Sequence, residues 1–157
     1  EITDCDWSSD VCSSDLGMPC IYYGDEYGMH GLMDPFNRGT FFENDKETYQ
    51  DVLKLTNMRN REKVLQTGHA LYMAADDDVL AILRFISSKK DVFGEACENK
   101  ALLLLINPTQ MEKEIEIDLA EAKEGVSESE LQLLSKNLTK TVVKTKAAPM
   151  DYKIIEL

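Results

Sequence analysis

The sequence lacks the features of a membrane-spanning or nucleic-acid-binding protein. It has no run of eighteen or more apolar residues, and its first residues lack the basic and apolar parts of a secretory signal. Its 17 Lys and Arg residues are outnumbered by 29 Asp and Glu, which gives a net charge of −12 without any basic cluster. Phosphate binding needs clustered cations, so we expect neither nucleic acid nor a membrane as a partner.

Cysteine and histidine are also scarce. The two histidines, His30 and His69, have no metal-ligand spacing around them, and Asp76–Asp78 lacks the alternation of a calcium loop. We therefore expect no metal and no cofactor. Cys20 and Cys97 lie far apart in a chain without a secretory signal, which predicts reduced, packed thiols and favours a cytoplasmic location.

The first sixteen residues differ from the rest. Cys5 to Leu16 resembles the conceptual translation of a sequencing adapter, and residues 1–16 hold the single tryptophan, two cysteines and five acidic residues with no Lys or Arg. Without them the net charge falls to −7. We interpret residues 1–16 as an artefactual or disordered tail and expect the folded protein to begin at Gly17.

Residues 17–67 combine one expected strand, one long loop and one helix. Pro19–Tyr23 is rich in β-branched and aromatic residues and predicts a short buried strand. Gly24–Asp45 is too rich in glycine for a regular element and too long for a tight turn, which is typical of a functional loop.

The helix is expected to begin after either of two capping residues. Asn44 with Glu47 would form a capping box, and Asp45 is the alternative cap. Helical spacing of apolar residues then continues to about Arg61, and Leu65–Gly68 is expected to be a connector.

Residues 68–157 have the period of β-strands. Alternation of Ile115, Ile117 and Leu119 with acidic residues predicts a strand with one buried face, whereas Ala101–Ile106 is apolar throughout and predicts a central strand. Seven strands are expected in an all-β antiparallel sandwich: Ala70–Ala74, Val79–Ser87, Ala101–Ile106, Lys113–Leu119, Leu131–Leu134, Thr141–Lys146 and Tyr152–Leu157.

The order of these elements indicates part of a larger protein, because a single strand with one helix has nothing to pair with. The segment Gly17–Glu26, with Tyr-Tyr-Gly-Asp-Glu at its end, resembles the last barrel strand of the α-amylase superfamily. Gly28–Gly31 followed by Asp34-Pro-Phe-Asn-Arg38 resembles the next loop in neopullulanases, cyclomaltodextrinases and related enzymes.

The resemblance extends to the end of the chain. Met58-Arg59 is similar to the final barrel helix, and Asp77–Ala81, Leu102–Pro108 and Pro149–Leu157 are similar to strands of the C-terminal domain. The resemblance implies that residues 17–67 are the last strand, loop and helix of a TIM barrel, an α/β barrel fragment. Residues 68–157 would then be the C-terminal β-sandwich domain.

The family resemblance implies a retaining glycoside hydrolase acting on α-glucan oligosaccharides, whose two catalytic carboxylates lie on earlier barrel strands. The Asn-His-Asp segment that carries a third family aspartate is absent. We therefore assign no catalytic residue to this chain, expect it to be inactive alone, and leave a homo-oligomeric parent enzyme open.

The same resemblance implies that Asp34 and Arg38 bind the donor-side sugar, with a salt bridge between them as the alternative. Of the adjacent Tyr22 and Tyr23, one is expected to pack in the barrel and the other to lie near the sugar cleft. Either order fits the sequence, and Tyr23 is taken as the sugar-binding residue. Asp25 and Glu26 point to opposite faces of an extended strand end, so we expect them to accept hydrogen bonds within the loop.

A second interpretation is a non-catalytic β-sandwich module that binds carbohydrate or a partner protein. It requires exposed aromatic side chains beyond Gly68, where the candidates are Tyr72, Phe85, Phe93 and Tyr152. Phe85 and Tyr152 lie in apolar strands and are expected to be buried. A third interpretation, an acidic scaffold without a ligand, is compatible with the charge alone.

Overall fold

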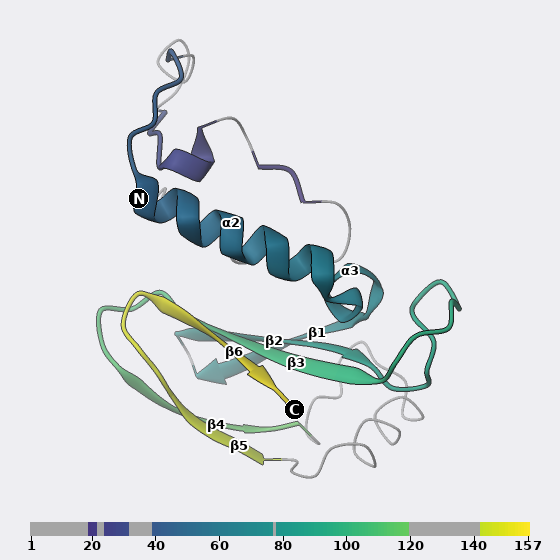
Figure 1. The fold of residues 1–157 in the computed structure, drawn as a ribbon. Coiled ribbons are helices and arrows are strands. Elements are labelled where there is room, and N and C mark those ends of the chain that lie inside the picture. Colours follow the sequence, from purple (N-terminus) through teal and green to yellow (C-terminus); the bar gives the residue numbers. More distant parts are fainter. Residues whose placement is uncertain (1–18, 22–23, 32–38, 77, 120–141) are drawn as a thin grey trace. The chain divides into compact units, whose positions relative to one another are not determined.

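The computed structural model describes residues 19–21, 24–31, 39–76, 78–119 and 142–157, which form two compact units divided between Glu62 and Lys63. The expected tail, residues 1–16, lies outside the described residues. The first unit contains the 3₁₀ helix η1 (Asp25–Tyr27) and helix α2 (Lys46–Arg61). The second unit, called the β domain here, contains α3 (Lys63–Thr67) and strands β1 (His69–Asp76), β2 (Val79–Ile86), β3 (Lys100–Asn107), β4 (Lys113–Asp118), β5 (Val142–Ala147) and β6 (Asp151–Glu156) (Figure 1).

Helix α2 begins and ends where its sequence signals predict. Asp45, rather than Asn44, is the N-cap, and its carboxylate accepts hydrogen bonds from the backbone N–H groups of Glu47 and Thr48. The last helical residue is Arg61. The capping-box alternative is therefore wrong, because the residue with the extended N-cap conformation is one position later.

Residues 19–21, the described part of the strand expected at Pro19–Tyr23, have no regular secondary structure. A parallel strand is stable only when neighbouring strands accept and donate its backbone hydrogen bonds. Among the described residues of the first unit no strand is available to do so.

The expected connector at Leu65–Gly68 is instead mostly helical, because α3 covers Lys63–Thr67. Val64 and Leu65 are buried, and α3 packs against β2 and β3. The β domain therefore begins at Lys63 rather than at the expected residue 68.

The described strands form two antiparallel sheets that lie as two layers in Figure 1. The larger sheet has the order β1-β2-β3-β6, and β4 pairs with β5 in the smaller one. Six of the expected strands are confirmed with shifts of one or two residues at their ends. The seventh, Leu131–Leu134, lies outside the described residues.

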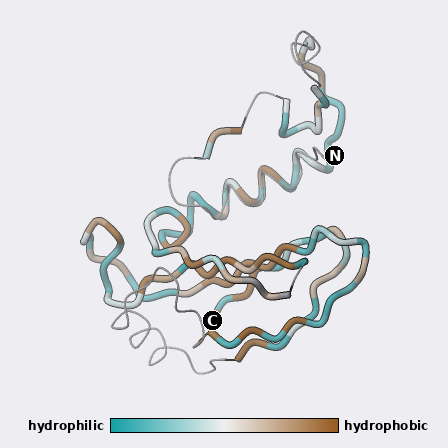
Figure 2. Tube along the Cα trace, turned by 180° about the vertical axis from the view of Figure 1, so that it is seen from behind, coloured by the Kyte–Doolittle hydropathy of each residue, from teal (hydrophilic) through white to brown (hydrophobic). Residues whose placement is uncertain are grey.

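The core of the β domain lies between these sheets. Side chains of β1, β2 and β3 pack with Ile115, Ile117 and Leu119 of the β4 segment, whose intervening residues Glu114 and Glu116 are exposed. Strand β3 is buried on both faces from Ala101 to Asn107, as its apolar run predicts. Figure 2 shows the same concentration of apolar residues along the strands of the larger sheet.

A buried arginine on β2 fixes the position of α3. The side chain of Arg84 is fully buried, and its guanidinium donates hydrogen bonds to the carbonyl oxygens of Val64 (3.2 Å), Leu65 (3.1 Å) and Gly68 (2.9 Å). Val64 and Leu65 belong to α3, and the Val64 carbonyl also accepts a hydrogen bond from the Gly68 N–H at 3.1 Å. A Cβ at Gly68 would overlap the carbonyl oxygen of Val64, so glycine is required where the chain leaves α3.

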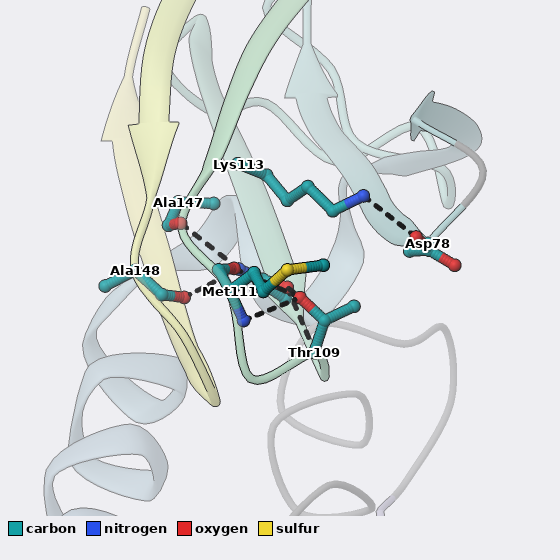
Figure 3. A network of polar contacts seen from close by, with 7 residues as sticks. Asp78, Thr109, Met111, Lys113, Ala147 and Ala148 are labelled. Carbon is teal, nitrogen blue, oxygen red and sulfur yellow. Dashed lines mark hydrogen bonds and ion pairs between the residues drawn. The ribbon is translucent and has the colours of Figure 1, made fainter.

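A buried asparagine joins the two sheets at their other end. The Asn107 side chain, at the end of β3, donates to the carbonyl oxygens of Met111, Ala147 and Ala148 at 2.8–3.1 Å and accepts from Thr109 (Figure 3). One amide group thus links β3 with the turn before β4 and the end of β5, which sets the separation of the sheets there.

No helix in the described part of the chain is long and apolar enough to cross a membrane.

We expect Arg84→Met to lower the free energy of unfolding of the β domain by about 3 kcal/mol, because the substitution removes three charge-assisted hydrogen bonds inside the protein. Urea unfolding followed by circular dichroism measures the change. Arg61→Met, at an exposed position in the last turn of α2, is the matched control and should cost less than about 0.5 kcal/mol. Equal losses for the two variants would contradict the role of Arg84.

Candidate functional site

The residues assigned to sugar binding, Tyr23, Asp34 and Arg38, lie outside the described residues. The structure describes the two chain segments on either side of Asp34 and Arg38. We call residues 24–31 the first limb, residues 39–45 the second limb, and residues 24–45 together the site loop. The contacts within and between these two limbs show how the ends of the site loop are held.

The first limb turns tightly through η1. Gly24 has φ +90°, and a Cβ there would lie 2.6 Å from the sulfur of Met29, so the turn admits only glycine. The Glu26 carboxylate accepts a hydrogen bond from the Gly24 backbone N–H at 2.9 Å. Glu26 therefore accepts a hydrogen bond within the loop, as predicted.

The two limbs meet at their bases. The Asp45 N–H donates to the carbonyl oxygen of Tyr27 at 3.2 Å, and a Cβ at Gly28 would lie 3.7 Å from that of Asp45. Further along, Gly39 approaches the terminal methyl group of Met29, with 4.0 Å between that methyl group and a Cβ at Gly39. The Met29 side chain of the first limb therefore lies beside Gly39 of the second limb.

Three aromatic rings pack at this base. The Tyr27 ring stacks on that of Tyr49 in α2, with 4.7 Å between centroids and 5° between planes, and meets Phe41 edge-on at 5.5 Å and 79°. Burial and then the negative charge of Glu43 raise the pKa of Tyr27, so its hydroxyl stays neutral at physiological pH. No local sequence pattern identifies Tyr27, since its partners are 14 or more residues away.

The β domain displays two aromatic residues at its surface. Phe93 is 77% exposed and Tyr72 is 48% exposed, whereas Phe85 is buried, as predicted, and Tyr152 is partly buried. These exposures satisfy one requirement of the binding-module interpretation.

Phe93 lies on a well-ordered turn between β2 and β3. The Asp91 carboxylate, 1% exposed, accepts hydrogen bonds from the N–H groups of Phe93 (3.0 Å) and Glu95 (2.9 Å), and lies 3.7 Å from the ammonium of Lys63. Burial raises the pKa of Asp91, but a hydrogen bond from Thr67, the two N–H groups and the Lys63 charge outweigh burial and lower it overall. The carboxylate is therefore charged and holds the turn against α3.

Cys20 and Cys97 are both free thiols, and Cys20 is exposed rather than packed as expected. Cys97 is partly buried, which raises its pKa. Within the described ranges, no three His, Cys, Asp or Glu side chains lie close enough together to hold a metal ion.

Comparison with known proteins connects these features to one family. No protein-family model matches the chain. Over 118 residues, 73% of its length, the chain is 40% identical to the amylopullulanase of Thermoanaerobacterium thermosulfurigenes. It is also 33% identical to the cyclomaltodextrinase of Geobacillus thermopakistaniensis over 63% of its length.

Solved structures agree with the sequence comparison. The debranching enzyme of Nostoc punctiforme matches 96% of the chain with a TM-score of 0.70 and 20% identity. The α-amylase of Geobacillus thermoleovorans matches 97% with a TM-score of 0.69 and 16% identity. The chain belongs to the α-amylase superfamily of glycoside hydrolases.

The chain corresponds to a small part of these α-amylase-superfamily enzymes. It spans 6% of the T. thermosulfurigenes amylopullulanase, 16% of the cyclomaltodextrinase and 30% of the N. punctiforme enzyme. The antiparallel β domain is therefore one domain of an α-amylase-superfamily protein.

The N-cap of α2 provides a test of the site loop's second limb. The Thr48 hydroxyl, followed by the Thr48 and Glu47 N–H groups, lowers the pKa of Asp45 against a smaller opposing effect of burial. We expect Thr48→Val to raise this pKa toward the unfolded value of about 3.9. A side-chain carboxyl NMR titration measures the change.

Because the folded-state pKa of Asp45 is depressed, the cap stabilises α2 fully above the unfolded pKa, and the stabilisation is lost as the pH falls through the folded pKa. Thr56→Val is the control, since the Thr56 hydroxyl donates to the carbonyls of Val52 and Leu53 within the same helix. An Asp45 pKa that is unchanged in Thr48→Val would show that the hydroxyl does not set it.

Proposed function

We propose that this chain supplies one wall of the sugar-binding cleft and the C-terminal β domain of a retaining glycoside hydrolase that acts on α-glucans such as maltodextrins, cyclodextrins or pullulan. Residues 17–62 are the end of its catalytic TIM barrel. Asp34 and Arg38 bind the donor-side sugar together with Tyr23, and the catalytic carboxylates come from elsewhere in the enzyme.

The observation that carries this proposal is the 40% identity to an amylopullulanase over 73% of the chain. The Met29 side chain lies beside Gly39, so the two described limbs that flank Asp34 and Arg38 in the sequence approach each other. A carboxylate can accept from sugar hydroxyls while a guanidinium donates from a rigid fork, which orients a sugar without transferring a proton. Loops at the carboxyl ends of barrel strands form the active-site face of such barrels.

The first limb supports a binding role over a catalytic one. Retaining hydrolysis needs two carboxylates about 5 Å apart that converge on one sugar. The Glu26 carboxylate instead accepts a hydrogen bond from the Gly24 N–H within its own turn. We therefore infer that the chain alone does not hydrolyse α-glucans.

A non-catalytic carbohydrate-binding module is the second candidate, favoured by the exposure of Tyr72 and Phe93. The two candidates differ in where sugar binds. An NMR titration of the 157-residue chain with maltoheptaose in which only signals of the β domain shift, with the site loop unaffected, would favour the module.

We expect Asp34→Ala and Arg38→Ala each to raise KM for a maltodextrin by about 10- to 100-fold, because each removes a charge-assisted hydrogen bond to sugar. The measurement uses a chimeric enzyme, the T. thermosulfurigenes amylopullulanase with its matching segment replaced by residues 17–157 of this chain. Asp51→Ala, at an exposed position of α2, is the control. An unchanged KM in both site variants would contradict the assignment of Asp34 and Arg38 to sugar binding.

A further inference from the structure

We propose that the turn between β2 and β3 is a second α-glucan-binding site, where the Phe93 ring stacks against a sugar and the Glu95 carboxylate accepts hydrogen bonds from sugar hydroxyls. This inference rests on the proposed function, because it takes the substrate to be an α-glucan. It adds a point of attachment on the β domain that uses neither Asp34 nor Arg38.

The tip of this turn exposes apolar side chains to solvent. Phe93 is 77% exposed and the neighbouring Val92 is 40% exposed. A Cβ placed at Gly94 would meet no atom within 4 Å, so the chain next to Phe93 also borders open space. The turn extends beyond the end of the larger sheet in Figure 1, and Figure 2 shows an apolar segment at its tip. A ligand can therefore reach the Phe93 ring from solvent.

A buried carboxylate holds this turn in one conformation. The Asp91 carboxylate, 1% exposed, accepts hydrogen bonds from the N–H groups of Phe93 (3.0 Å) and Glu95 (2.9 Å). The Val92 N–H donates to the carbonyl oxygen of Thr67 in α3 at 3.0 Å. The backbone at Phe93 and on both sides of it is thus already fixed, so a ligand that binds the ring loses little affinity to ordering of the turn.

The side chains of Phe93 and Glu95 match the two kinds of surface on a glucose unit. A pyranose ring has faces made of C–H groups and a rim of hydroxyl groups. An aromatic ring offers a large apolar contact and has only two side-chain torsions to restrict. A carboxylate accepts hydrogen bonds from hydroxyl groups, and Glu95 is exposed one residue beyond Gly94. The turn therefore combines an apolar platform with a hydrogen-bond acceptor.

The first experiment titrates the full 157-residue chain with maltoheptaose and follows the backbone amide signals by NMR. We expect the signals of residues 91–95 to shift, and Phe93→Ala to raise the dissociation constant measured from them about tenfold. Phe93→Tyr keeps an aromatic ring and should retain the original constant. Met150→Ala is the matched control, since Met150 is 61% exposed on the turn between β5 and β6.

The pattern of shifts separates this site from the proposed function. If residues 91–95 do not shift, the Phe93 site is overturned, whether or not the site loop responds. Shifts confined to residues 91–95 support the Phe93 site and favour the binding-module interpretation over the proposed function. Sedimentation velocity tests a different occupant: self-association of the chain that Phe93→Ala abolishes would make the tip a contact between copies and overturn the proposal.

The second experiment measures KM for pullulan and for maltotetraose in the chimeric enzyme. A polymer held at the second site has a raised effective concentration at the cleft, whereas a tetrasaccharide in the cleft has no remaining length for a second contact. We therefore expect Phe93→Ala to raise KM for pullulan about fivefold relative to KM for maltotetraose. Phe93→Tyr should restore the parental ratio, and Met150→Ala should not change it.

The same kinetics show which of the two proposals fails. An unchanged KM ratio in Phe93→Ala overturns the second site, and the proposed function stands if Asp34→Ala and Arg38→Ala still raise KM. If Phe93→Ala changes the ratio while Asp34→Ala and Arg38→Ala leave KM unchanged, the Phe93 site is supported and the proposed sugar contacts fail.

Discussion

The β domain depends on one buried contact, the guanidinium of Arg84 against the carbonyl end of α3. A fully buried cation in an otherwise apolar strand is costly unless hydrogen-bond acceptors surround it. Three carbonyl oxygens of α3 and the following glycine provide them at 2.9–3.2 Å. The arrangement is mutual, because the same contact gives the carbonyls of Val64, Leu65 and Gly68 a charged donor and thereby fixes α3 against β2.

Sequence pattern predicts well where the structure obeys a local period. The alternation of Ile115 and Ile117 with glutamates and the unbroken apolar run at Ala101–Ile106 each report which faces are buried, and both predictions are confirmed. The connector at Leu65–Gly68 was wrong because α3 is too short to have a period of its own and is held by an arginine 16 or more residues away. The signal that could have indicated this contact is the single charged residue in the apolar run Val79–Ile86.

The residues of the candidate site also differ in whether the sequence could predict them. Asp34, Arg38 and Tyr23 come from resemblance to a family, since no spacing rule identifies a sugar contact, and they remain predictions. The packing of Tyr27 against Phe41 and Tyr49 was missed because both partners are separated from it in the chain. The choice between Asn44 and Asp45 as the cap was open for a different reason: both residue types are good caps, and only the backbone conformation distinguishes them.

One general constraint on ligand-binding loops relates the packing of the two limbs to the proposed function. A loop that orients a ligand through charged side chains must lose little freedom on binding, and that requires rigid ends. The limbs meet this requirement with Gly24, whose positive φ permits the turn, and with the stacked rings of Tyr27 and Tyr49. Gly24, Tyr27 and Tyr49 lie outside the segment that carries Asp34 and Arg38 in the sequence. Under the proposed function, the residues that hold the limbs are therefore different from the residues that bind sugar.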